Sequence, residues 1–192
     1  DVPEPGILAF SNAQFNVNED GTPVNQVKII RTGGSQGEVS ATIDLTNGTA
    51  TPDDYDKTSI TVTFANGETE KNVTVPITND TFVENTETIN LTLTNPTNGA
   101  LLGTQKTATL TILDDDVQLN FSAANYTVSE DGTAVTDIIV TRTGRTTGTV
   151  GATITFTNGT AKGCACGLHL TTSDFLSSPI TVILGENEIS KI

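Results

Sequence analysis

The 192-residue chain contains no Met or Trp, one His, two Cys and nine Lys and Arg residues, and these shortages exclude several classes of protein. With nine bases against 23 acidic residues the net charge is −14, so nucleic acid would be repelled. One His, with no nucleophile–base pairing and no glycine-rich loop before a helix, argues against an enzyme. No apolar run approaches the ~20 residues of a transmembrane helix.

The chain is rich in Thr, which occurs 37 times, and 35% of its residues are hydrophobic. This composition is typical of half-buried β-strands and not of a disordered acidic tail. We therefore expect a folded all-β protein. Because the sequence starts with Asp and has no Met, we also expect a mature or excised segment whose targeting signal is not visible.

An internal repeat divides the chain, because an offset of 111 residues superposes much of its first half on its second. Val17–Thr22, for example, falls on Val128–Thr133. The second copy carries nine extra residues within an insertion at 162–171, and it has no counterpart of residues 80–116. We predict an N-terminal arm at residues 1–6, a complete domain at residues 7–116 and a second, truncated domain at residues 117–192.

Period-2 alternation in the first copy predicts β-strands with one apolar face. Val39, Ala41, Ile43 and Leu45, for instance, alternate with polar residues, and Gly, Asn, Pro and Asp clusters separate such segments. The pattern indicates tandem immunoglobulin-like, seven-stranded β-sandwiches, the second of them incomplete. The seven strands are expected near residues 15–17, 24–30, 39–45, 60–64, 73–77, 89–93 and 108–112.

Eleven of the 17 acidic residues in residues 1–117 lie in connections that share one end of the predicted sandwich. Antiparallel strands alternate in direction, so the connections after the first, third, fifth and seventh strands meet at one pole. With Lys57 as the one base nearby, these carboxylates repel one another and favour a bound cation. Hard oxygen ligands fit Ca²⁺, and ordinary solvated loop acids are the alternative. The eleven are Glu19, Asp20, Asp53, Asp54, Asp56, Asp80, Glu84, Glu87, Asp114, Asp115 and Asp116.

The first copy and the front of the second resemble the Calx-beta domain family. The resemblance rests on Val-x-Glu-Asp-Gly-Thr, Asn-Gly-Thr-Ala-Thr-Pro-Asp-Asp-Tyr, Ile-Thr-Asn-Asp-Thr-Phe-Val-Glu-Asn-Thr-Glu and Leu-Thr-Ile-Leu-Asp-Asp-Asp, in that order. The family occurs in sodium/calcium exchangers, in an integrin beta subunit and in bacterial, especially cyanobacterial, surface proteins. The resemblance thus implies a tandem Calx-beta protein of the bacterial surface or extracellular type. It implies these calcium ligands: Glu19, Asp54, Asp80, Glu84, Glu87, Asp114, Asp115 and Asp116.

Two departures from the family pattern lower the expected calcium binding. A single Asp80 stands in the fifth connection, where the strongest calcium binders have an acidic run, so the resemblance implies fewer ions or weaker affinity. The second copy retains Glu130, Asp131 and Asp174 but lacks the remaining ligands. Residues 1–117 carry a net charge of −12 and residues 118–192 only −2, so we expect the second copy alone to bind calcium poorly.

The insertion contains Cys164, Cys166 and His169. Their spacing differs from that of haem attachment, and three ligands would leave Zn²⁺ one short of its usual four. A disulfide between residues two apart is strained. An exposed loop or an intermolecular disulfide is the preferred interpretation, and metal binding is the alternative.

Two hypotheses for function follow. The first is a secreted or cell-surface module, structural or adhesive and not enzymatic, in which Ca²⁺ bridges the acidic connections and stiffens the junction between the copies. The second is a self-assembling filament subunit, whose incomplete second domain is completed by a strand from a neighbouring chain, with Val2–Gly6 as an extended arm. The expected partners are therefore calcium ions and other protein chains.

Overall fold

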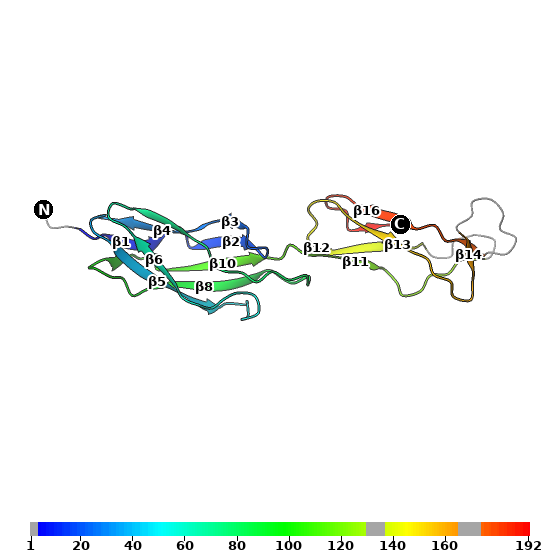
Figure 1. The fold of residues 1–192 in the computed structure, drawn as a ribbon, viewed down its shortest axis with the longest axis horizontal. Helices are drawn as coiled ribbons and strands as arrows, with labels where there is room; N and C mark the ends of the chain where they lie inside the picture. The colour runs from blue at the N-terminus through cyan, green and yellow to red at the C-terminus, as the bar shows by residue number, and fades with distance from the viewer. Residues whose placement is uncertain (1–3, 130–136, 165–173) are drawn as a thin grey trace. The chain divides into compact units, whose positions relative to one another are not determined.

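Every regular element in the part of the chain that the computed structural model describes, residues 4–129, 137–164 and 174–192, is a β-strand (Figure 1). This confirms the predicted all-β class. These residues form no helix that is long and apolar enough to cross a membrane. The chain divides into two units, residues 1–116 and residues 117–192.

The first unit is a β-sandwich of two sheets, with strand order β7-β4-β1-β9 in one and β3-β2-β10-β8-β5-β6 in the other (Figure 1). Neighbouring strands are mostly antiparallel, but β10 runs parallel to β2, and β9 parallel to β1. The strands are β1 (Ile7–Phe10), β2 (Gln14–Asn18), β3 (Pro23–Asn25), β4 (Val27–Thr32), β5 (Val39–Asn47), β6 (Ile60–Phe64), β7 (Glu70–Val73), β8 (Glu87–Thr94), β9 (Leu101–Leu102) and β10 (Thr107–Leu113).

The core lies between these sheets and is made by the alternating apolar residues of the strands. In β5 the buried positions are Val39, Ala41, Ile43 and Leu45, and the residues between them face outward. Burial of each large aliphatic side chain contributes ~1.5–3 kcal/mol, which stabilises this register over one shifted by a single residue. β8 and β10 complete the core with Ile89, Leu91, Leu93, Ala108, Leu110 and Ile112.

All seven predicted strands of the first copy have a counterpart, with three differences. The segment 24–30 divides at Gln26, because β3 pairs with β2 in one sheet and β4 with β1 in the other. β7 ends at Val73, and the next pairing beyond Pro76, which cannot donate a hydrogen bond, is an isolated bridge at Ile77. β1 and β9 are additional strands, too uniformly apolar or too short to show a period of two.

Residues 4–6 of the predicted arm bind to the first unit. The carbonyl groups of Glu4, Pro5 and Gly6 accept hydrogen bonds from Gln36 N, Arg31 Nε and Leu101 N, respectively. Residues 1–3 lie outside the described residues. These bonds would have to break before residues 4–6 could act as a donor strand for another chain.

The second unit repeats part of this arrangement in three small sheets, β11-β12-β17, β13-β16 and β14-β15. Among its described residues, the buried apolar side chains are Val140 and Leu184. Cys166, His169 and the acidic pair at 130–131 lie outside the described residues. The strands are β11 (Val117–Phe121), β12 (Val140–Gly144), β13 (Val150–Ile154), β14 (Gly163–Cys164), β15 (Phe175–Leu176), β16 (Ile180–Leu184) and β17 (Ser190–Lys191).

Candidate metal centre

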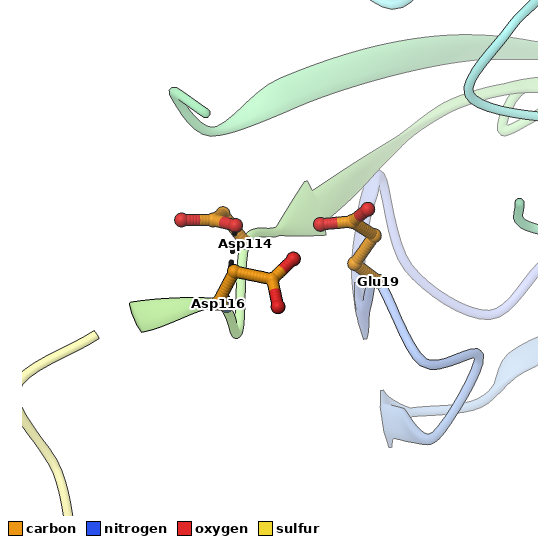
Figure 2. A group of neighbouring side chains, drawn as sticks. All are labelled: Glu19, Asp114 and Asp116. Atoms are coloured by element: carbon orange, nitrogen blue, oxygen red, sulfur yellow. Dashed lines mark hydrogen bonds between the residues drawn. The ribbon is translucent and has the colours of Figure 1, made fainter. Parts of the chain in front are cut away.

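A first group of three acidic side chains lies where β2 and β10 end side by side. Glu19 directly follows β2, and its backbone N donates to Leu113 O at 2.9 Å, which extends the parallel pairing by one residue. Asp114 and Asp116 follow β10, and Figure 2 shows the carboxylates of Glu19 and Asp116 pointing toward one another beside Asp114. One carboxylate oxygen from each residue lies within 4.8 Å of the others. Two oxygens that bind one Ca²⁺ at ~2.4 Å are at most ~4.8 Å apart, so the spacing suits a shared ion.

A second group joins Asp54 of the β5–β6 connection to Glu84 and Glu87, which lie before and at the start of β8. Their carboxylate oxygens also lie within 4.8 Å of one another. One small cavity is lined by acidic residues of both groups. They are Glu19 and Asp114 from the first group and all three residues of the second. The two groups are therefore neighbours, and each supplies oxygen ligands of the kind that Ca²⁺ prefers.

The β5–β6 connection holds Asp54 in place through bonds of its own. Asp54 Oδ2 accepts hydrogen bonds from Thr51 N at 2.6 Å and from Thr51 Oγ1 at 2.8 Å. The next residue, Tyr55, is buried, and its hydroxyl donates to Asn47 Oδ1 at 2.8 Å. A Cβ atom at Gly48 would lie 2.3 Å from Thr88 Oγ1, so the start of the connection requires glycine. The side chain of Asp54 is thus preorganised toward β8.

Asp80 and Asp115, the other two predicted ligands, lie outside both groups. Asp80 contacts the first group through its backbone N, which donates to Glu19 Oε1 at 3.1 Å, while its Oδ1 accepts from Phe82 N at 2.7 Å. Asp115 Oδ1 is buried without a hydrogen-bond partner among the described residues. The structure therefore brings six of the eight predicted residues into two groups and leaves Asp80 and Asp115 beside them.

Burial and mutual repulsion raise the pKa of three of these carboxyl groups, Glu19, Glu84 and Glu87. Burial raises the pKa of Glu19 to about 7, although a hydrogen bond from Asp80 N opposes this shift. The charges of Asp80, Asp116 and Asp114 also raise this pKa. Burial also raises the pKa of Glu87 to about 7, with a hydrogen bond to Asp54 and nearby charges as further causes. Neighbouring carboxylates thus add to the effect of burial, and a bound cation would favour the ionised forms.

The second group contains carboxyl groups shifted in opposite directions. Burial and then the charges of Asp54, Asp80, Asp114 and Asp116 raise the pKa of Glu84, which therefore responds to both groups. Burial opposes ionisation of Asp54 as well, but hydrogen bonds from Thr51 and Glu87 outweigh it and lower the pKa of Asp54. The ion pairs Lys28–Glu70, Lys71–Glu68 and Lys191–Glu188 use other acidic residues.

Two neutral side chains that sequence reasoning did not select also line the cavity between the groups, Thr78 and Asn85. The available signal was the position of Asn85, between Glu84 and Glu87 in the same connection. Side-chain amide oxygens are ordinary Ca²⁺ ligands, so Asn85 adds a neutral donor at this site. Asp20 and Asp56 instead accept hydrogen bonds from Thr22 N and Thr58 N, as residues that cap turns do.

The sequence of the chain matches a known protein family. The family model of the Calx-beta domain matches residues 1–116 and again residues 114–167, and the chain belongs to this family. The two matches make it a tandem Calx-beta protein, as the repeat and the four motifs predict.

Individual relatives cover different parts of the chain. The Adhesion G-protein coupled receptor V1 of Danio rerio is 37% identical over 114 residues, which are 58% of this chain and 2% of that receptor. The crystal structure of the apo form of the Calx CBD1 domain is 25% identical and covers 57% of this chain and 96% of its own, with a TM-score of 0.50. The crystal structure of the calcium-binding domain CBD12 of CALX1.1 is 22% identical and covers 96% of this chain and 72% of its own, with a TM-score of 0.55. The last likeness supports a tandem fold.

Proposed function

We propose that residues 1–116 form a calcium-binding module of a secreted or cell-surface protein with a structural or adhesive, non-enzymatic role. The observation that carries the proposal is the pair of acidic groups, each with carboxylate oxygens within 4.8 Å of one another, which both line one cavity. The family and the adhesion receptor relative support the same role.

In this proposal Ca²⁺ acts as an electrostatic cross-link between connections that are distant in sequence. Glu19 and Asp114 directly follow β2 and β10, Asp54 lies in the β5–β6 connection, and Glu84 and Glu87 lie before and at the start of β8. Asp80 and Asp115 are proposed as additional ligands, because both lie next to these groups.

The same ions are proposed to stiffen the junction between the two units. Asp116 belongs to the first group and is the last residue of the first unit, and β11 begins at Val117. An ion held at Asp116 would restrict the backbone at the point where the chain enters the second unit.

Calcium removal and readdition tests the proposal. Ligands that bind only the folded state add about 2.7 kcal/mol to the unfolding free energy at 100 times their Kd. We expect the melting temperature of the first unit to fall on chelation and to recover with CaCl₂, and calorimetry to show binding of Ca²⁺ in preference to Mg²⁺. An unchanged melting temperature together with no heat of binding would refute the proposal.

A matched pair of variants locates the effect. Asp54→Asn removes a charge from the second group and retains an oxygen that can accept the bonds from Thr51, so we expect weaker calcium binding without loss of the fold. Asp174→Asn makes the same change at the corresponding position of the second copy, where Asp174 Oδ2 accepts from Lys162 N. We expect calcium binding to be unchanged in the Asp174 variant.

A second candidate function is self-assembly, in which a strand from a neighbouring chain completes the second unit. Phe121 in the second unit is 52% exposed, whereas the corresponding Phe10 in the core of the first unit is 1% exposed. This exposed apolar side chain favours self-assembly. Sedimentation velocity over a wide range of protein concentrations tests it. A monomer at every concentration would exclude self-assembly.

A further inference from the structure

A polar hollow lies on the outer face of the six-stranded sheet in the first unit, over β2, β10 and β8. Its volume is about 480 Å³, within the ~300–1,000 Å³ that is usual for sites of small molecules. We call it the amide hollow. The polar side chains that line it are those of Gln14, Asn90, Thr92, Gln105, Thr107 and Thr109.

The strand register brings these side chains together from segments that are distant in sequence. Thr109 of β10 is opposite Gln14 of β2 on one side and opposite Asn90 of β8 on the other. Thr107 of β10 is opposite Thr92 of β8. Because directly opposed residues on one face of a sheet have Cβ atoms only ~4.5–5.5 Å apart, the five polar groups are close enough to contact one ligand.

Two of the amide groups are held in place by the backbone. Asn90 Nδ2 donates a hydrogen bond to Asn47 O at 3.1 Å, and Gln105 Nε2 donates to Thr107 O. Each amide keeps a carbonyl oxygen that can accept further hydrogen bonds, and each threonine hydroxyl can both donate and accept. The amide hollow therefore suits a ligand that carries several hydroxyl groups near one another.

The composition of the lining excludes two other classes of ligand. None of the described residues that line the amide hollow is charged, although residues 1–117 carry a net charge of −12. A charged ligand would therefore find no counter-charge there. Leu91 and Ala108 also line the hollow, but their side chains belong to the core and are 0% and 7% exposed. An apolar ligand would therefore find no large side chain to contact.

A protein strand is also a poor ligand for this face. β10 is paired with β2 and β8, and β8 is paired with β10 and β5, so their backbone groups are already used in the sheet. Strand addition needs an unpaired edge, and other protein contacts depend on large aromatic or apolar anchors. Neither is present among the residues that line the amide hollow.

We infer that the amide hollow binds a neutral oligosaccharide. Sugar hydroxyls would donate to the free carbonyl oxygens of Asn90 and Gln105 and would accept from threonine hydroxyls. Such a site selects for hydroxyl groups, because a ligand without them leaves its polar groups unpaired. The inference goes beyond the proposed function, since no residue of either acidic group lines the hollow.

The test titrates the full chain of 192 residues with cellotetraose, maltotetraose and mannotetraose, and follows backbone amide shifts by NMR. We expect at least one of these neutral sugars to shift residues 13–14, 90–92 and 105–109 saturably, with a Kd of about 1 mM. Tetragalacturonic acid should bind at least about tenfold more weakly, because the chain is acidic and the hollow has no base. No saturable shifts with any neutral sugar, or equal binding of the acidic one, would refute the inference.

Variants of the chain locate the site. A double variant, Thr92→Val with Thr109→Val, keeps the side-chain shape and the preference for strands but removes two hydroxyls, so the affinity should fall at least about tenfold. Thr42→Val makes the same change on β5, outside the hollow, and should leave the affinity unchanged. An unchanged affinity in the double variant, or an equal loss in the Thr42 variant, contradicts the inference.

A third variant covers the case in which the double variant does not fold. Gln14→Ala removes an exposed side chain at the rim of the hollow and should weaken binding about fivefold. Unchanged binding in this variant would count against the site.

Chelation separates this inference from the calcium proposal. Sugar binding should persist in EDTA, because the amide hollow shares no residue with the acidic groups. Loss of sugar binding in a chain that remains folded in EDTA would overturn the inference. Sugar binding by a chain that shows no heat of binding with CaCl₂ would refute the calcium proposal alone.

Discussion

The two units share their strand registers but differ in how far their cores are covered. The first unit buries 22 hydrophobic residues in one cluster, whereas the described part of the second buries Val140 and Leu184. The β13–β16 pair nevertheless has the register of β5–β6. The comparison indicates that local strand sequences set the pairing, and that burial depends on β8 and β10.

The largest expected difference between the units is the effect of removing a matched core side chain. Ile43→Ala should lower the unfolding free energy of the first unit by about 2–5 kcal/mol, because Ile43 is fully buried. Ile154→Ala should cost less, about 1 kcal/mol or below, because Ile154 lines an open cavity. Denaturation followed by tyrosine fluorescence measures both, since Tyr55 and Tyr126 are the only tyrosines and each lies in one unit. Equal costs would show that Ile154 is covered in solution.

A second pair of variants sharpens the comparison at the opposite pole, where the units are alike. Arg31 and Arg142 are 2% and 4% exposed, and each guanidinium donates four hydrogen bonds to backbone carbonyls. Replacing either by Met leaves buried carbonyls without a charged donor, so we expect each unit to lose about 2–3 kcal/mol. The acceptors are Pro5, Gln36, Gly37 and Ala65 for Arg31, and Arg145, Thr147, Gly148 and Gly185 for Arg142.

These equal losses should have unequal consequences. The first unit should remain folded in the Arg31→Met variant, whereas the less covered second unit should lose its cooperative transition in Arg142→Met. Circular dichroism with thermal unfolding, read beside the tyrosine signals, measures this difference. A second unit that keeps a sharp transition in Arg142→Met would contradict the expectation that it is only marginally stable.

A further expected difference between the units is in their pH dependence without calcium. The pKa values of Glu19 and Glu87 are raised from 4.5 to about 7 in the folded protein, so folding binds protons between these values. Their contribution to stability is complete below pH 4.5 and is lost as the pH rises to about 7. We therefore expect the melting temperature of the first unit to decrease over this interval, and Glu19→Gln to flatten the decrease.

The second unit should not follow this trend. The hydrogen bond from Gly185 N lowers the pKa of Glu188, so the stability contributed by Glu188 is lost only as the pH falls below about 4.5. Between pH 4.5 and 7 the second transition should stay constant. A parallel decrease in both transitions would mean that the change does not originate at Glu19 and Glu87.

Much of the fold and of the acidic pole could be predicted from the sequence. Alternation in β5, β6, β8 and β10 locates four strands, and the alternating strand direction places Glu19, Asp54, Glu84 and Asp114 at one end. The division of the acids into two groups could not be predicted, because it depends on how the connections bend. Asp115 illustrates this, since it lies between two members of the first group in sequence and joins neither group.

The buried arginines were not predicted to be part of the fold, although Arg-Thr-Gly occurs in both copies at the repeat offset. Arginine is normally exposed, and only the structure shows the carbonyl groups that surround Arg31. The raised pKa values of Glu19 and Glu87 likewise depend on burial, which composition and spacing do not provide.

The parallel pairing of β2 with β10 has a mechanical consequence. The chain enters the first unit at the pole of Arg31, runs through β1 into β2 toward the acidic pole, and leaves from the end of β10 at that same acidic pole. Tension along the chain therefore slides β2 against β10 lengthwise. The five residue pairs from Gln14↔Thr109 to Asn18↔Leu113 share this load and must rupture together. Glu19 and Asp114 continue the same two strands, so an ion between them would lie in line with the force.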